Sequence, residues 1–130
     1  MKKRIILAAA AVLLALGGWQ TGGFLFRGMK AAEVVRKLSA IRLALALYAV
    51  EHKKPPAAFE DLLNSGKLEA VPELKLRGHF YSSKVANVPA FAVRDTGGWA
   101  YVNDPRSRDF GLAYIDCSHK DEKGRYWSEF

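Results

Sequence analysis

The stretch that decides the fold is residues 29–53, MKAAEVVRKLSAIRLALALYAVEHK, in which apolar side chains recur at steps of three and four. This spacing places them on one face of a helix. The predicted packing or assembly face consists of Val34, Leu38, Ile41, Leu45 and Tyr48. Pro55-Pro56 ends the segment, because proline lacks a backbone donor and disfavours helical geometry in the residue before it. We therefore predict an amphipathic helix within residues 27–54.

A second set of apolar residues widens the apolar arc of this helix: Leu43, Ala44, Leu47 and Val50. In one interpretation the helix buries its apolar face on its own domain. In the other, one face covers the domain and another meets a neighbouring helix. The sequence leaves both open.

The N-terminus has the pattern of an export signal, in which the positively charged segment Met1–Arg4 precedes the apolar run Ile5–Leu16. Small residues at 15–17 suit cleavage by a signal peptidase, whereas the uncharged stretch 5–26 is long enough for a retained anchor. We predict a signal-anchor or signal peptide at 1–26. The predicted location is the bacterial inner membrane, single-pass, with the C-terminal domain in the periplasm or on the cell surface.

The remainder, 27–130, is predicted to be one α+β domain. After the helix we expect a linker at 55–78 with a short helix near 58–65, closed by Gly66. From 79 to 130 the pattern becomes short, aromatic and β-branched, which predicts a small antiparallel meander with a hairpin turn at 95–98. The predicted strands are 90–94, 99–103 and 111–116, with edge candidates at 79–81 and 125–127.

The order of these elements resembles the type IV pilin and type II secretion pseudopilin family. The pieces that match are the anchored helix ending at Tyr48, Pro55-Pro56, the short helix, and a Gly-Gly-Trp-x-Tyr hairpin. The hairpin motif consists of Thr96, Gly97, Gly98, Trp99 and Tyr101. The resemblance implies a long N-terminal helix, half in the membrane and half on a sheet, that bundles with other pilin-like subunits or secretion machinery. The family's processing glutamate has no counterpart here.

Catalysis has weak support. Cys117 and His119 are the parts of a thiol catalyst and share a strand face, but no glycine-rich elbow surrounds them to build an oxyanion site. We therefore expect no enzyme, no small-molecule substrate, and no catalytic or cofactor-binding residues.

Metal binding also has weak support. Four aspartates of the C-terminal half are candidates for calcium, but their spacing is typical of turns and caps: Asp104, Asp109, Asp116 and Asp121. The three histidines, His52, His79 and His119, lie too far apart in sequence to indicate zinc. We predict no metal ligands.

The chain carries a net charge of +7, and Lys2, Lys3 and Arg4 of the leader supply part of this charge. The remaining basic residues are scattered, which is typical of a solvated surface. The sequence therefore favours a non-enzymatic structural or assembly component. The alternative is an envelope-tethered domain that binds DNA or another polyanion, with Trp99 and Tyr101 as a stacking platform.

Overall fold

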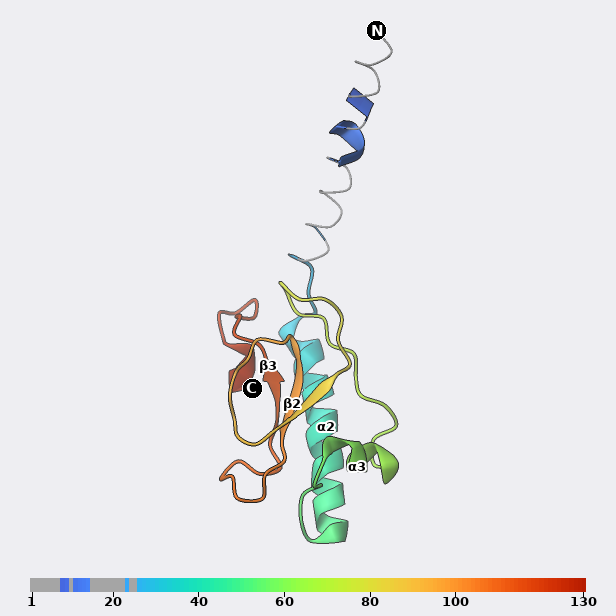
Figure 1. The fold of residues 1–130 in the computed structure, drawn as a ribbon, viewed down its shortest axis with the longest axis vertical. Helices are drawn as coiled ribbons and strands as arrows, with labels where there is room; N and C mark the ends of the chain where they lie inside the picture. Colours follow the sequence, from blue (N-terminus) through green and yellow to red (C-terminus); the bar gives the residue numbers. More distant parts are fainter. Residues whose placement is uncertain (1–7, 10, 15–22, 24–25) are drawn as a thin grey trace.

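The computed structural model describes residues 8–9, 11–14, 23 and 26–130 (Figure 1). The helices are α2 (Ala31–His52), α3 (Phe59–Asn64) and the 3₁₀ helix η1 (Trp127–Glu129), and the strands are β1 (Val85–Val88), β2 (Gly98–Val102) and β3 (Ala113–Asp116). The 22-residue helix α2 lies along one face of the three-stranded sheet (Figure 1). The predicted mixed α+β class is confirmed.

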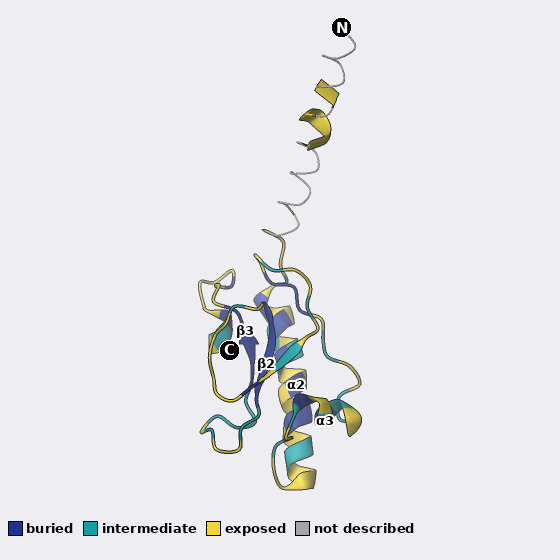
Figure 2. Ribbon diagram, in the orientation of Figure 1, coloured by how far each residue is buried: buried dark blue, intermediate teal, exposed yellow. Residues whose placement is uncertain are grey.

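Helix α2 has one buried side and one exposed side (Figure 2). Of the predicted packing face, Val34, Leu38, Ile41 and Leu45 are buried and Tyr48 is half-buried. Leu43, Leu47 and Val50 are exposed by 62%, 51% and 69%. The helix therefore covers the sheet with one face and presents a second apolar face to its surroundings.

The central strand β2 is buried along its whole length, and its residues alternate between two clusters. Trp99 and Tyr101 belong to the main core with α2, whereas Ala100 and Val102 face the other side of the sheet. This two-residue alternation is the ordinary geometry of a strand. Two polar groups anchor the aromatic pair: Trp99 Nε1 donates to the Pro72 carbonyl at 2.8 Å, and Tyr101 Oη donates to the Pro56 carbonyl at 2.7 Å.

The predicted antiparallel meander is wrong in one respect. Strand β3 pairs antiparallel with β2, but β1 pairs with β2 in parallel, with Val85 opposite Trp99. Pro89 follows β1 and supplies no backbone donor to extend the ladder. The sheet is therefore mixed.

The segment 90–94, predicted as a strand, belongs instead to the connection 89–97 that covers the second face of the sheet. Tyr114 Oη donates to the Ala92 carbonyl at 2.7 Å, and the rings of Phe91 and Tyr114 lie 4.6 Å apart. The predicted hairpin turn at 95–98 is therefore wrong. Its backbone is held by the Asp116 side chain and by one bond from the Gly97 N–H to the Asp116 backbone carbonyl, and residues 90–94 form no strand.

Of the other short elements, the predicted helix is present and the two predicted edge strands are not. Helix α3 confirms the predicted short helix, and Gly66 follows it with a φ of +73°. The predicted edge strands at 79–81 and 125–127 are not strands. Near them the structure has isolated bridges, Leu74 with Ser82 and Lys120 with Tyr126, and η1 follows the second.

The predicted continuous N-terminal helix is not confirmed, because residues 27–30 are not helical and α2 begins at Ala31. Among the described residues, none of the helices combines the length and the apolar character needed to cross a membrane. This finding contradicts the predicted transmembrane helix and the single-pass location in the bacterial inner membrane. Most of the predicted leader at 1–26 lies outside the described residues.

Candidate metal centre

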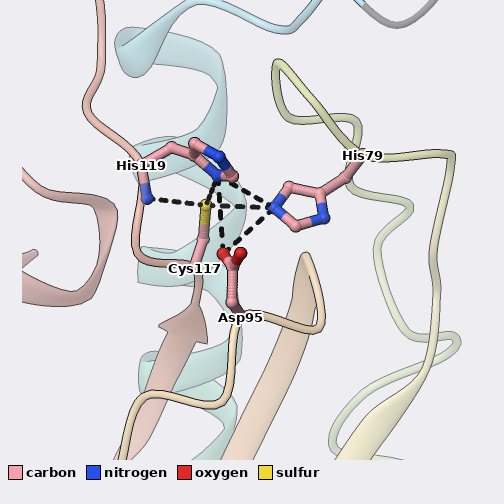
Figure 3. Close-up of side chains that lie close together, drawn as sticks. All are labelled: His79, Asp95, Cys117 and His119. Atoms are coloured by element: carbon pink, nitrogen blue, oxygen red, sulfur yellow. Dashed lines mark hydrogen bonds and ion pairs between the residues drawn. The ribbon is translucent and has the colours of Figure 1, made fainter.

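Four side chains that are distant in sequence converge on one point beyond the end of β3: His79, Asp95, Cys117 and His119 (Figure 3). Their ligand atoms, His79 Nε2, Asp95 Oδ1, Cys117 Sγ and His119 Nδ1, all lie within 4.8 Å of one another. Cys117 is fully buried, the His79 side chain is 13% exposed, and those of Asp95 and His119 are 38% and 49% exposed. The cluster therefore has a buried floor and an open rim.

Cys117 and His119 come from the chain that leaves β3. Cys117 follows the last strand residue directly, so its position is fixed by the sheet. The His119 backbone N–H donates to Cys117 Sγ at 3.4 Å, which folds the chain back toward the sulfur. A backbone donor to sulfur also stabilises the thiolate form that binds metals.

His79 comes from the loop between the bridged residues Leu74 and Ser82, and it packs on the backbone of Gly97. Gly97 has a φ of +73°, and a Cβ there would lie 2.3 Å from Cγ of His79. Only glycine leaves room for the imidazole at this distance. The glycine of the predicted hairpin motif therefore serves the cluster and not a hairpin.

Asp95 lies on the connection 89–97 with a φ of +61°, in the left-handed region. Non-glycine residues adopt this region rarely, and such positions concentrate at functional sites. Its Oδ1 accepts the Ser118 backbone N–H at 2.8 Å. Burial by itself raises the pKa of Asp95, but hydrogen bonds from Ser118 and the charges of His119 and His79 outweigh it and hold the pKa below its usual range.

Most distances among the four atoms are close to those of tetrahedral coordination. Zinc bonds of ~2.0–2.1 Å to nitrogen or oxygen and ~2.3 Å to sulfur set ligand atoms roughly 3.3–3.6 Å apart. His79 Nε2 lies 3.1 Å from His119 Nδ1 and 3.2 Å from Asp95 Oδ1. Cys117 Sγ lies 3.4 Å from both nitrogens, and His119 Nδ1 lies 3.4 Å from Asp95 Oδ1. Five of the six distances are therefore close to those of a tetrahedral shell, and the sixth, from Cys117 Sγ to Asp95 Oδ1, is at most 4.8 Å.

Hydrogen bonds alone do not account for this arrangement. One ring nitrogen carries at most one proton, yet His79 Nε2 has a nitrogen, a sulfur and a carboxylate oxygen within 3.4 Å. A catalytic triad is excluded by the same geometry. It requires the carboxylate on the ring nitrogen opposite the nucleophile, whereas Asp95 and Cys117 face the same nitrogen of His79.

The donor set would suit zinc better than calcium or magnesium. Two imidazoles, a thiolate and a carboxylate are ligands that zinc accepts in tetrahedral sites, whereas calcium and magnesium prefer oxygen alone. With neutral histidines, the charges of the thiolate and the carboxylate balance a divalent cation. Burial raises the pKa of the Cys117 thiol to about 11, and the Asp95 carboxylate adds to the effect. A metal ion bound here would therefore displace a proton from Cys117.

None of the four aspartates considered for calcium belongs to a group of potential metal ligands among the described residues. Asp104 pairs with Arg106 and Asp121 with Arg125, while the Asp116 carboxylate accepts backbone N–H groups of residues 94–96. His52 stacks on Tyr48 and is not part of the cluster, unlike the other two histidines. Trp99 and Tyr101, 1% and 0% exposed, are too buried to stack on nucleic-acid bases.

His79 and His119 are far apart in sequence, but the fold brings His79 Nε2 to 3.1 Å from His119 Nδ1. The one local signal was the Cys-x-His spacing after a strand, which puts Cys117 and His119 on the same side. The positions of His79 and Asp95 depend on how two loops cross the sheet. Comparisons with known protein families, with curated proteins and with solved structures find no match to this chain, so its own geometry is the guide to its function.

Proposed function

We propose that this protein is a zinc-binding domain whose ion is held by His79, Asp95, Cys117 and His119. The observation that carries the proposal is the convergence of four ligand atoms of different residues within 4.8 Å. Four protein ligands complete a tetrahedral shell and leave no position for a substrate, which is the mark of a structural site. The ion's role is therefore to hold the fold together.

The proposed ion joins three segments that lie outside the strands of the sheet. The loop carrying His79, the connection carrying Asp95 and the chain after β3 contribute isolated bridges and turns but no strand of the sheet. Ordering such segments costs roughly 1–2 kcal/mol of backbone entropy per residue. A metal bound only by the folded chain offsets part of that cost, as it does in other small domains.

Metal titration of the full 130-residue protein tests the proposal. After treatment with a chelator, the protein should take up one Zn²⁺ per chain, measured by competition with a chromophoric chelator. Co²⁺ should give the intense visible absorption of tetrahedral coordination and a thiolate-to-metal charge-transfer band. Absence of stoichiometric uptake at neutral pH would contradict the proposal.

Variants identify the ligands. Cys117→Ser should remove the charge-transfer band, and His79→Ala should weaken binding strongly. His52→Ala is the matched control, because His52 contacts Tyr48 and lies outside the cluster. If His52→Ala weakened binding as much as His79→Ala, the ion would not be at the cluster.

A second candidate function is assembly with pilin-like subunits through α2, as the family resemblance implies. The observation that favours it is the exposed apolar side of α2 formed by Leu43, Leu47 and Val50. These residues are spaced by four and three, so they form one stripe on the helix. Apolar residues on a stripe of this kind are typical of helix–helix contacts.

Sedimentation velocity of the full chain tests this second function. Leu43→Lys with Leu47→Lys should shift the protein to smaller species, while Ala32→Lys, an exposed change near the start of the same helix, should not. The comparison between variants separates the α2 stripe from any association caused by other parts of the chain. Equal sedimentation of all three proteins would count against assembly through α2.

A further inference from the structure

Asp116 is a buried carboxylate that belongs to no ion pair among the described residues and is not one of the four candidate ligands. It is 1% exposed at the last position of β3. Burying a carboxylate is costly unless hydrogen bonds replace the lost water. Its bonds therefore indicate what it does.

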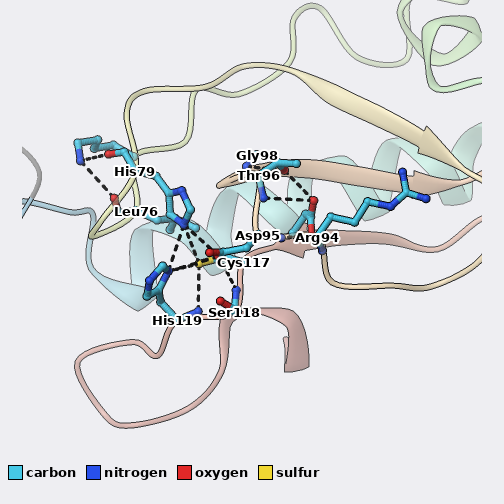
Figure 4. Close-up of polar contacts among 11 residues, drawn as sticks. Leu76, His79, Arg94, Asp95, Thr96, Gly98, Cys117, Ser118 and His119 are labelled. Atoms are coloured by element: carbon cyan, nitrogen blue, oxygen red, sulfur yellow. Dashed lines mark hydrogen bonds and ion pairs between the residues drawn. The ribbon is translucent and has the colours of Figure 1, made fainter.

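All its side-chain bonds go to the connection that carries Asp95. Figure 4 shows this connection at Arg94, Asp95 and Thr96, beside Cys117 and His119. Asp116 Oδ1 accepts the backbone N–H groups of Arg94 at 2.6 Å and Asp95 at 3.1 Å. Oδ2 accepts the Thr96 N–H at 3.4 Å and the Thr96 hydroxyl at 2.7 Å. Successive backbone N–H groups that point at one anion form a rigid concave turn.

This turn determines where the Asp95 side chain lies. Asp116 binds the backbone N–H groups of Asp95 and of its two neighbours, Arg94 and Thr96. The Gly97 N–H also donates to the Asp116 backbone carbonyl at 2.8 Å, so the backbone on both sides of Asp95 is fixed. Asp95 is held in the left-handed region at a φ of +61°. Ser118 then orients the carboxylate toward the histidines.

Asp116 and Cys117 are neighbours on the chain with different tasks. Adjacent residues of a strand point to opposite faces, so Cys117 reaches the cluster while Asp116 reaches the connection on the other side. One short segment therefore supplies a ligand and also the group that places a second ligand beside it.

We propose that Asp116 is a positioning residue of the metal site, which presents Asp95 to the ion without contacting it; this inference rests on the proposed zinc binding. Groups that orient metal ligands change affinity by ~10–100-fold when they are removed. The Asp116 side chain makes no hydrogen bond to the other three ligands, and its charge raises the pKa of Cys117 less than burial and Asp95 do, so its main route to the ion is through Asp95. A general role in stability would instead affect the whole domain.

A double-mutant cycle separates these roles. In the wild type, Asp116→Asn should lower zinc affinity ~10–100-fold and shift the Co²⁺ spectrum toward that of Asp95→Ala. In the Asp95→Ala background, the same change should alter affinity less than about threefold, because coupled residues are not additive. Equal effects in both backgrounds would overturn the proposal.

Two further variants keep the test decisive. Thr96→Val removes the hydroxyl that donates to Asp116 at 2.7 Å and accepts the Gly98 N–H at 3.4 Å, and it should weaken zinc binding in the same direction even if Asp116→Asn does not fold. Asp104→Asn is the control, because Asp104 accepts the Arg106 backbone N–H in the turn after β2 but lies outside the cluster. If wild type binds no zinc, the proposed function fails. If wild type binds zinc and both Asp116→Asn and Thr96→Val bind equally well, the positioning role alone fails.

Discussion

Two regions that share strand β3 are held together by different forces. Ile115 points from the strand into the apolar core under α2, among Leu38, Trp99 and other buried side chains. Cys117, two residues later and on the same side, also reaches that core but faces two histidines and an aspartate. Core packing stabilises the first region without any ion, whereas the second would gain stability from the proposed cation. Substitutions in the two regions should therefore differ in their response to metal.

The largest effect is expected from the core. Trp99→Ala removes a fully buried ring and its bond to the Pro72 carbonyl. We expect a loss of ~3–5 kcal/mol in the free energy of unfolding, since large-to-small core changes leave a cavity. Chemical denaturation with zinc and with chelator should give the same loss. A loss that appears only with zinc would show that the two regions are not independent.

The second-largest loss of stability should depend on whether zinc is present. At zinc concentrations ~100-fold above the dissociation constant, binding stabilises the wild type by ~2.7 kcal/mol. Cys117→Ser should lose most of this gain, because it removes the thiolate at the floor of the cluster. The measurement is the shift of the melting temperature on adding zinc. A shift in the variant as large as that of the wild type would contradict the role of Cys117.

A smaller loss of stability is expected at Gly97, where the effect of backbone strain can be separated from the effect on zinc binding. Gly97→Ala places a Cβ against the His79 ring at a φ of +73°, while Gly66→Ala meets the same φ with nothing within 4 Å. Both should lose of order 1–3 kcal/mol from backbone strain. Only Gly97→Ala should also weaken zinc binding, measured by chelator competition. Equal zinc affinity in the two variants would show that the contact with His79 does not matter.

The smallest effect should come from a carboxylate outside both regions. Asp121 accepts N–H groups of Lys123 and Arg125 and pairs with the Arg125 guanidinium. Burial raises the pKa of Asp121, but these bonds outweigh it and leave the pKa below its usual range.

Its contribution to stability is therefore present above the unfolded pKa of ~3.9 and is lost as pH falls through the lower folded pKa. With chelator present, the wild type should lose stability more steeply than Asp121→Asn on acidification below about pH 4. Melting temperatures measured against pH provide the check. Parallel curves would mean that Asp121 is not the group that titrates.

The structural predictions from sequence were most accurate where they depend on a local pattern of residues. The buried face of α2, the end of that helix near the two prolines, and α3 with Gly66 follow from spacing and from residue chemistry over a few positions. The alternation of Trp99 and Tyr101 against Ala100 and Val102 also follows from local spacing. Such features depend on neighbours in the chain, so one sequence is sufficient to predict them.

The parallel pairing of β1 and the cluster were decided by the tertiary structure. Residues 90–94 have the composition of a strand, but Asp116 and Tyr114 hold the connection 89–97 on the second face of the sheet. That long-range contact changes a predicted hairpin into a loop and puts Asp95 beside residues 79, 117 and 119. The sequence by itself determined an amphipathic helix and a buried aromatic strand, because periodicity is local. Only the tertiary structure decided that four distant side chains meet, since their proximity depends on how loops cross the sheet.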